Sequence, residues 1–333
     1  MKLISIVKGF QEPWGNEDKM STWIKHHISL FIRITTLIVI TVFLGVIRPE
    51  FLSVNNLINQ LRQSSLIFLL ASGLTVVVLS EGIDLSIGQV LALSACITGS
   101  LLKTQPMFVA ILVGLGVGSM CGLINGVLIA FIGLPAFVVT YGMMWMAQGA
   151  AAMFMKAEII WGFPKAFRFF GARNLSGIPV PVILMFLIFG ILYLILNYTN
   201  FGRHIYNIGA NYEASRFSGV PIRKTQILAY TLSGFLAAFA GVVYISRINA
   251  VEAGIGEPLL LPCLAAITIG GISLFGGEGG IGGTIFGAVI MSLIISGMNF
   301  LGIGTYWQQF VIGAIVILSV WMDQLQSKKF QTA

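Results

Sequence analysis

Residues 107–131 read MFVAILVGLGVGSMCGLINGVLIAF, a run of 25 residues without a single charged side chain. About 20 consecutive apolar residues suffice for a helix to cross the roughly 30 Å hydrocarbon core of a bilayer, because a helix rises about 1.5 Å per residue. The run is too long for a barrel strand and lacks the polar–apolar alternation that such a strand shows. It therefore predicts a membrane-spanning helix.

Nine further stretches of the chain are of the same kind. Of the 333 residues, 57% are hydrophobic and only 9% are charged, whereas about 25% of the residues in a soluble domain are charged. We therefore expect an all-α polytopic membrane protein, with about ten transmembrane helices in one bundle. The expected spans lie near residues 29–47, 64–80, 86–102, 107–131, 135–155, 180–197, 225–246, 258–275, 284–301 and 305–322.

Both ends of the chain are expected in the cytoplasm. Residues 1–28 mix basic and acidic side chains and contain no apolar run with a cleavage site, so they predict a cytoplasmic tail and not a signal peptide. The chain then divides into this tail, a transmembrane domain over residues 29–325 and a cytoplasmic C-terminal tail over residues 326–333. An even number of spans places both ends on one side, where basic residues are in slight excess. Residues 48–63 are expected to lie on the membrane surface.

The composition excludes several classes of function. The net charge of +7 comes from basic residues in loops and tails, without a basic stripe interleaved with aromatics, so no nucleic-acid binding is expected. Cys96, Cys121 and Cys263 fall in apolar runs at no metal-ligand spacing and are expected to be small buried hydrophobes. No catalytic, cofactor or metal site is expected.

The predicted spans contain one charged residue, Arg33. Charges inside a membrane are costly, and transporters driven by protons or sodium usually keep a carboxylate near the midplane. This chain has none there, so we expect the energy for any transport to come from elsewhere.

Glycines recur at every fourth position of the run over residues 107–131: Gly114, Gly118, Gly122 and Gly126. Residues at this interval share one helix face, and small residues there let another helix backbone approach closely. Both a static close contact and a helix that lines a moving interface fit this pattern.

The loop over residues 198–224 predicts a short helix. Asn211 is a good N-cap, and Gly219 with Pro221 would end the helix after two turns. The flanking basic residues suit a cytoplasmic face. A short polar helix that carries Phe217 is shaped to fit a groove on another protein. A solvated loop helix is the alternative.

Four separated motifs resemble one family. They are GLTVVVL (73–79) followed by GIDLSIG (82–88), the coupling loop around residues 211–219, AITIGGISLFGG (266–277), and NFLG (299–302) with YWQQ (306–309). Together they resemble the sugar-transport permeases of the ATP-binding-cassette type, and the ribose permease group in particular. The likeness covers residues 50–325, and residues 249–262 depart from the usual pattern.

The resemblance implies a permease subunit that is not itself an enzyme, in a bacterial inner membrane. A second copy or a homologous permease would complete the pathway within the membrane lipid. A cytoplasmic ATP-binding subunit, which could be a fused double ATPase, would dock on the coupling loop, and a periplasmic binding protein would deliver a monosaccharide such as ribose. The coupling residues would be Asn211, Glu213, Ala214, Arg216, Phe217, Ser218 and Gly219. A neutral sugar needs hydrogen-bonding partners and no counter-charge, and the candidates are Asn125, Tyr141, Gln148, Ser292 and Asn299.

Other residues of the motifs are assigned structural roles. Gly82, Gly276 and Gly277 are expected in tight turns between helices. Asp84 is expected to cap a helix between the second and third spans, with substrate contact as the alternative. Two other functions stay open: an amino-acid permease of the same transport class, and a secondary transporter.

Overall fold

The computed structural model describes residues 16–156 and 158–331, with side chains described over 31–156 and 158–324. Within these ranges the chain is mainly helical. The α-helices are α2 (Asn16–Ile47), α3 (Val54–Leu79), α4 (Ile87–Leu101), α5 (Met107–Val127), α6 (Ala136–Met155), α7 (Phe169–Ala172), α8 (Val180–Tyr198), α9 (Asn200–Ala210), α10 (Tyr212–Phe217), α11 (Ile222–Ile248), α12 (Leu260–Ile269), α13 (Ile281–Phe300) and α14 (Thr305–Gln331).

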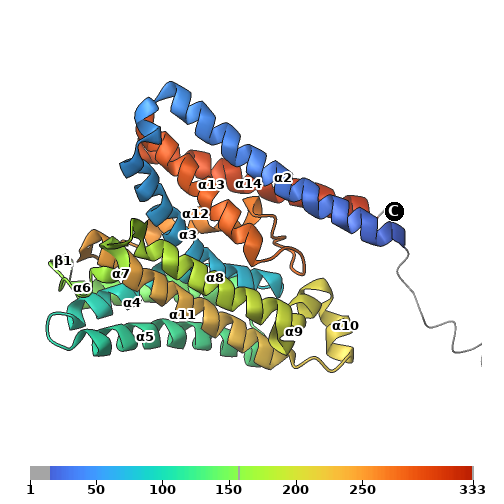
Figure 1. The fold of residues 1–333 in the computed structure, drawn as a ribbon. Helices are drawn as coiled ribbons and strands as arrows, with labels where there is room; N and C mark the ends of the chain where they lie inside the picture. Colours follow the sequence, from blue (N-terminus) through green and yellow to red (C-terminus); the bar gives the residue numbers. More distant parts are fainter. Residues whose placement is uncertain (1–15, 157, 332–333) are drawn as a thin grey trace, which may run out of the picture.

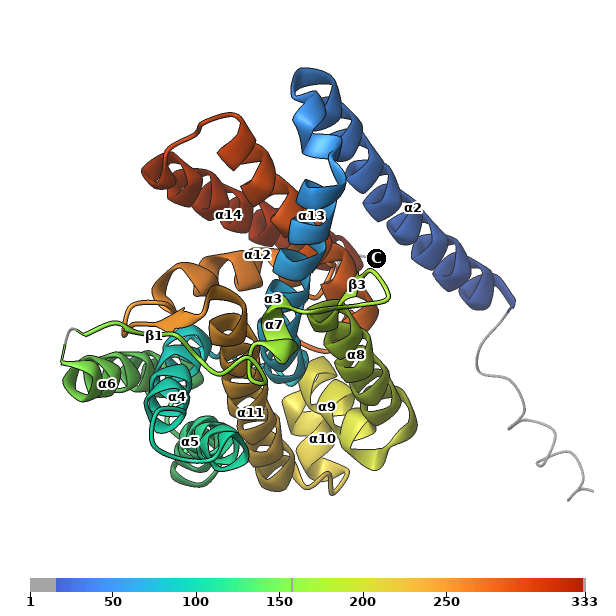
Figure 2. The same ribbon diagram turned by 60° about the vertical axis from the view of Figure 1, so that its left-hand side comes forward.

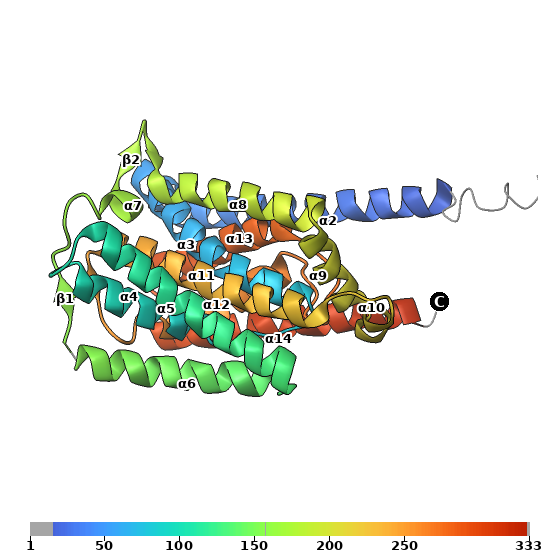
Figure 3. The same cartoon turned by 90° about the horizontal axis from the view of Figure 1, so that it is seen from below.

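Short turns and strands connect these helices. The helical turns are η2 (Pro49–Leu52), η3 (Leu128–Ile132) and η4 (Glu257–Leu259). Strand β1 (Ile160–Trp161) pairs antiparallel with β4 (Ala250–Val251), and β2 (Asn174–Leu175) pairs antiparallel with β3 (Ile178–Pro179). The long helices lie alongside one another, with β1 and β2 at one end of the bundle and α9 and α10 at the other (Figure 1, Figure 3). We call these the β1 end and the α10 end.

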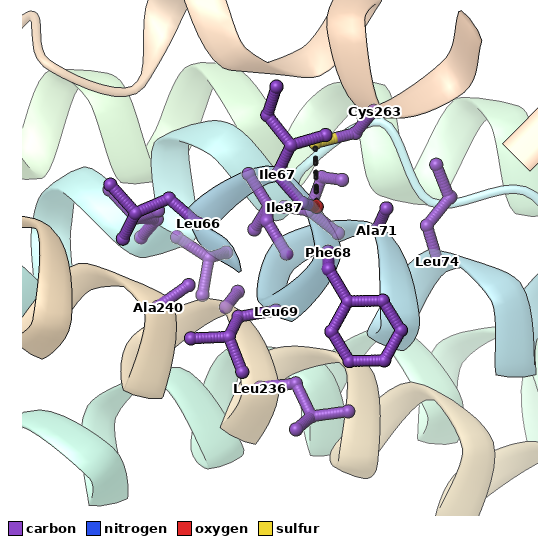
Figure 4. Close-up of a cluster of buried hydrophobic side chains, with 14 of the residues drawn as sticks. Leu66, Ile67, Phe68, Leu69, Ala71, Leu74, Ile87, Leu236, Ala240 and Cys263 are labelled. Atoms are coloured by element: carbon purple, nitrogen blue, oxygen red, sulfur yellow. Dashed lines mark hydrogen bonds between the residues drawn. The ribbon is translucent and has the colours of Figure 1, made fainter. Parts of the chain in front are cut away.

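Helix α3 lies at the centre of the bundle. It packs against α11, α13, α12 and α8, and 83% of its most apolar window is buried. Phe68 and Leu69 are fully buried in the cluster around it (Figure 4). The Cys263 thiol of α12 lies 3.8 Å from the carbonyl oxygen of Ile67, which agrees with the prediction of a small buried hydrophobe.

The structure confirms an all-α polytopic membrane protein. Seven helices in the described ranges are long and apolar enough to cross a membrane: α3, α5 with η3, α6, α8, α11, α13 and α14. The three other predicted spans correspond to shorter apolar segments, Phe31–Ile47, Ile87–Leu101 and Glu257–Ile269. The number of ten spans therefore remains a prediction.

Several predicted boundaries were wrong. Helix α3 begins at Val54, so most of the segment predicted to lie on the membrane surface belongs to this helix, and Phe51 before it is fully buried against Phe300. Helix α12 ends at Ile269 because Gly271 turns the chain with a positive φ of 75°.

The division into two cytoplasmic tails and a transmembrane domain stays a prediction, although helices extend into both tails. Helix α2 begins at Asn16, inside the predicted N-terminal tail, and residues 1–15 of that tail lie outside the described part of the chain. Helix α14 continues to Gln331, through most of the predicted C-terminal tail, and residues 332–333 lie outside the described part.

The glycine face of α5 packs closely against α11. A Cβ atom built on Gly118 would lie 2.5 Å from the carbonyl oxygen of Gly234, and one on Gly126 would lie 2.7 Å from the Cα atom of Ile227. On Gly122 it would collide with the carbonyl oxygen of Tyr230. Gly114, one turn from these, packs against α4 at Thr98. The interval of four residues thus brings two backbones into direct contact.

Candidate functional site

The α10 end carries the short helix that the sequence predicted. The side-chain oxygen of Asn211 accepts a hydrogen bond from the backbone N–H of Ala214 at 2.9 Å, so Asn211 is the N-cap of α10. The helix ends at Phe217, and Gly219 follows with a positive φ of 76°. Both predicted boundaries of this helix are confirmed.

The outer face of α10 carries an aromatic side chain that is unusually exposed. The side chain of Phe217 is 85% exposed. Arg216 and Glu213 lie on the same helix with exposed side chains whose nearest charged atoms are 3.9 Å apart. A screened pair of this kind contributes little to stability, so these three side chains are available for contacts with another molecule.

Helix α9 fixes α10 to the rest of the bundle. Ile205 and Ile208 of α9 are fully buried, and Gly209 packs directly against the carbonyl oxygen of Leu79, the last residue of α3, and against Gly277. The backbone N–H of Gly277 donates a hydrogen bond to the same Leu79 oxygen at 3.1 Å. Helix α9, which holds α10, therefore contacts both the central helix α3 and the turn before α13.

The predicted tight turns occur at two of the three expected glycines. Gly276 and Gly277 have positive φ angles of 89° and 72°. After α3, however, the left-handed residue is Glu81, with a φ of 61°, and Gly82 donates to the carbonyl oxygen of Val77. Gly82 is required for another reason, because a Cβ atom there would lie 2.7 Å from the Tyr230 hydroxyl. The assignment of this turn to Gly82 was wrong by one residue.

Asp84 forms a buried link between the start of α4 and α11. One carboxylate oxygen accepts hydrogen bonds from the backbone N–H and the hydroxyl of Ser86, at 3.0 and 2.6 Å. The other oxygen accepts one from the Ser233 hydroxyl at 2.8 Å. Asn125 donates to the Ser86 hydroxyl at 3.1 Å. All these groups are buried, so Asp84 organises the turn before α4. The N-cap of α4 is Ser86, so the prediction that Asp84 itself caps the helix was wrong by two residues.

A cavity of about 600 Å³ opens between α3, α11, α12 and α14. Arg247 lies in the last turn of α11, and α10 immediately precedes the first turn of the same helix, so the cavity is at the opposite end of the bundle from α10. Its wall combines apolar residues with neutral and charged polar side chains. The polar lining residues are Gln63, Tyr244, Arg247, Glu257, Thr305, Gln308 and Gln309.

Several of these polar groups lack protein partners. Within the described part of the chain, no hydrogen bond or ion pair joins the side chains of Gln63, Arg247, Glu257 or Gln309 to another residue. Since polar groups in a partly enclosed site are normally satisfied by protein, water or ligand, this wall can bind a polar molecule with several hydroxyl or charged groups. We call this space the large cavity.

The five residues predicted to line a pathway do not meet at one place. Asn125 and Ser292 are buried in contacts between helices, and Ser292 donates to the carbonyl oxygen of Gln60 at 3.1 Å. Tyr141 stacks on Phe137 at an exposed face of α6. Asn299 lies beside the large cavity, where it accepts a hydrogen bond from Gln308. Gln148 lines a second, smaller cavity.

The sequence interpretation missed the main polar residues of the large cavity. Arg247 and Glu257 were placed in loops, and Gln63 was placed before the second span. Gln308 and Gln309 belong to a motif that was recognised but given no role. A sequence signal was available, because charged or amide side chains within one turn of the ends of four separate predicted spans can share one side of the membrane.

The sequence of the chain can now be compared with those of known proteins. The profile of a family described as "Branched-chain amino acid transport system / permease component" matches residues 56–320. The ribose import permease protein RbsC of Escherichia coli strain K12 is 34% identical over 306 residues, which cover 90% of this chain and 94% of the relative.

Two further relatives carry other names. The fructose import permease protein FrcC of Rhizobium meliloti is 34% identical over 307 residues, which cover 89% of this chain and 84% of the relative. The galactose/methyl galactoside import permease protein MglC of Salmonella typhimurium is 30% identical over 331 residues, which cover 93% and 97% of the two chains. No solved structure matches the chain significantly.

Proposed function

The chain belongs to the family of permease components that this profile describes, and we propose from this premise that it forms the membrane pathway of an ATP-driven importer for a monosaccharide. The relatives are named as import permeases for ribose, fructose and galactose. The pathway requires a polar space in the membrane and a contact through which a separate ATPase acts on it.

One observation carries the proposal. Helix α11 follows α10 directly and ends in the wall of the large cavity, at Arg247. A force applied to α10 would reach the cavity through α11 and, by way of α9, through the end of α3. In this proposal the ATP-binding subunit docks in the cytoplasm on Asn211 to Gly219, with Phe217 in a groove and with Glu213 and Arg216 in charge-assisted contacts.

The proposal assigns the other partners by position. The β1 end faces the periplasm and receives the sugar-binding protein, and the exposed basic residues Lys165, Arg168 and Arg173 lie on that end. A second copy or a homologous permease lies beside the exposed apolar faces of α6 and α14. The assembly would sit in the inner membrane of a bacterium, and the ATPase activity would belong to the partner subunit.

The test is purification of the chain from its native membrane in mild detergent, followed by mass spectrometry of the bound proteins. We expect a stoichiometric ATPase, which is lost when Glu213 and Arg216 are both changed to Ala. The control is Lys165→Ala with Arg168→Ala, at the opposite end, which should leave the ATPase bound. A chain that purifies alone and still moves substrate into vesicles without ATP would contradict the proposal in favour of a secondary transporter.

An amino acid is the second candidate substrate, and one observation favours it. Arg247 and Glu257 place one positive and one negative side chain on the large cavity, which suits the two charges of a zwitterion. ATP-dependent uptake of labelled D-ribose, D-fructose, D-galactose and L-leucine by the purified complex in proteoliposomes distinguishes the two. We expect uptake of a sugar and none of leucine.

A further inference from the structure

A second cavity of about 160 Å³ lies between the start of α4, the middle of α6 and η4. Its polar lining residues are Gln89 of α4, Gln148 of α6 and Glu257 of η4, and the indole of Trp145 completes the wall. Glu257 also lines the large cavity, so η4 separates the two spaces. We call this space the small cavity.

Gln89 is the most informative residue of the small cavity. Its side chain is only 5% exposed, and its buried Oε1 atom has no hydrogen-bond partner. Burial of an amide oxygen without a partner is costly, and native proteins retain such groups where a ligand or water satisfies them. Gln148 and Glu257 also make no side-chain hydrogen bond within the described part of the chain.

The backbone holds these groups in place. Gly256, next to Glu257, touches Gly88, next to Gln89: a Cβ atom on Gly88 would lie 2.5 Å from the Gly256 carbonyl oxygen. This contact positions η4 directly over the first turn of α4. Any larger residue at either glycine would separate Glu257 from Gln89.

The small cavity lies about midway along the length of the bundle. Gly99 of α4 contacts Val251 of β4, at the β1 end. Gln89 precedes Gly99 by ten residues on the same helix, which places it about 15 Å deeper at about 1.5 Å per residue. That depth is about half of the roughly 30 Å hydrocarbon thickness. A substrate that moves inward from the large cavity would meet the small cavity near the membrane midplane.

The chemistry of the lining selects a class of ligand. Amides and a carboxylate can both orient sugar hydroxyls, which donate and accept hydrogen bonds, and an indole can cover the apolar face of a sugar ring. The volume is well below the roughly 300–1,000 Å³ of sites for drug-sized ligands. No lysine or arginine lines the space as described, so a carboxylate-bearing ligand would lack a counter-charge.

We propose that the small cavity, formed by Gln89, Trp145, Gln148 and Glu257, is a midplane resting site for one neutral sugar ring, which sets the preference for neutral monosaccharides over amino acids or acidic sugars. This inference rests on the proposed function, since it assigns a site within the same transport pathway. Gln89 and Gln148 are the specificity-determining residues, and neither takes part in contacts with the ATPase.

The experiment uses the whole complex, with its ATPase and binding protein, in proteoliposomes. The variant is Gln89→Met with Gln148→Met, because methionine matches glutamine in size and removes only the hydrogen-bonding amide. The matched control is Gln105→Met, an exposed residue that lines neither cavity. Three quantities are measured: uptake of whichever labelled sugar the wild type moves fastest, among D-ribose, D-fructose and D-galactose; ATP hydrolysis in the same vesicles; and the thermal unfolding midpoint.

We expect sugar uptake per ATP hydrolysed to fall about tenfold or more in the double variant, as two hydrogen bonds are lost. The ATPase rate and the unfolding midpoint should not fall, since the change removes an unsatisfied buried amide, and Gln105→Met should behave like the wild type. Unchanged uptake per ATP in the double variant would overturn the resting site, with water as the sole occupant, and would leave the proposed function intact. A parallel loss of uptake and ATPase activity would also overturn it, in favour of a structural role. A wild-type complex that moves no sugar at all would refute both proposals.

Discussion

Helices α5 and α14 are both apolar enough to span a membrane, but they occupy opposite environments. Figure 2 shows α5 grouped with α4 and α11, whereas α14 lies on the far side of the molecule beyond α12. In α5 the glycine face touches the backbone of α11, and 28% of the apolar window is buried. In α14 the corresponding share is 6%, and a Cβ atom on Gly313 would meet nothing within 4 Å.

The difference shows that apolar character alone does not determine how a helix is used in a membrane. Lipid is as apolar as leucine, so close packing requires small residues that bring backbones together. The helices α3, α4, α5 and α11 form such a packed half. The open half consists of α6, which lines the small cavity, and α14, which lines the large cavity, and it exposes large side chains such as Phe310. We infer that the packed half supports the pathway and that the open half completes the walls of its cavities.

The largest effect should come from breaking the contact between α5 and α11. Gly122→Ala would place a methyl group inside the contact radius of the Tyr230 carbonyl oxygen, so we expect a loss of about 3 kcal/mol in the free energy of unfolding. The matched control is Gly116→Ala on the same helix, where nothing lies within 4 Å. It should change stability by about 1 kcal/mol or less, in the stabilising direction. Unfolding in mixed micelles measures the free energy of unfolding of both variants. Equal effects of the two substitutions would contradict a stabilising contact between α5 and α11.

The next largest effect should come from the buried link at Asp84. Asp84→Ala would leave the hydroxyls of Ser86 and Ser233 without their acceptor, and we expect destabilisation of about 2–3 kcal/mol. Asp84→Asn keeps an acceptor for Ser86 and should lose less. The same unfolding assay applies. A transport defect in Asp84→Ala at unchanged stability would instead favour the alternative of substrate contact.

A smaller and opposite effect is expected at the end of α3. Glu81 occupies the left-handed region at a φ of 61°, which costs a residue other than glycine about 1–2 kcal/mol. Glu81→Gly should therefore stabilise the protein by about 1 kcal/mol, and Glu81→Ala should not. A loss of stability in the glycine variant would show that the Glu81 side chain contributes more than its backbone conformation costs.

The smallest effect is expected on α14. Phe310 is largely exposed in the single chain, so Phe310→Ala should change the unfolding free energy of the isolated chain by no more than about 0.5 kcal/mol. If a second permease covers this face, the same variant should weaken association, which cross-linking in the membrane or native mass spectrometry would detect. A large loss of stability in the isolated chain would remove the distinction between the two halves.

The sequence predicted the membrane class, the helix α10 and its boundaries because these depend on local features. Apolar run length, the Asn211 cap and Gly219 act within a few residues. The glycine interval also predicted a close contact, although the partner α11 could not be read from it. The sequence could not predict which residue after α3 adopts the left-handed conformation, because Glu81 takes a conformation that local propensity disfavours.

The cavities were beyond prediction for a different reason. Their walls combine residues from α3, α4, α6, α11, η4 and α14, which are far apart in the sequence. Polar residues inside spans, such as Asn125 and Ser292, looked like pathway residues. Asn125 instead donates to the Ser86 hydroxyl, and Ser292 donates to the backbone oxygen of Gln60. Residues near span ends, such as Arg247 and Gln63, looked like loop residues but line the large cavity.

The most direct test of the central claim compares the reactivity of two thiols. In a chain with Cys96→Ala and Cys263→Ala, Gln309→Cys places a thiol in the large cavity, while the native Cys121 remains buried on α5. The measurement is the rate of labelling by a membrane-impermeant maleimide in the assembled transporter, with and without the transported sugar. We predict fast labelling at position 309 that the sugar slows, and no labelling of Cys121 in either condition. Equal reactivity at the two positions, or labelling at 309 that is indifferent to the sugar, would contradict the assignment of the pathway to the large cavity.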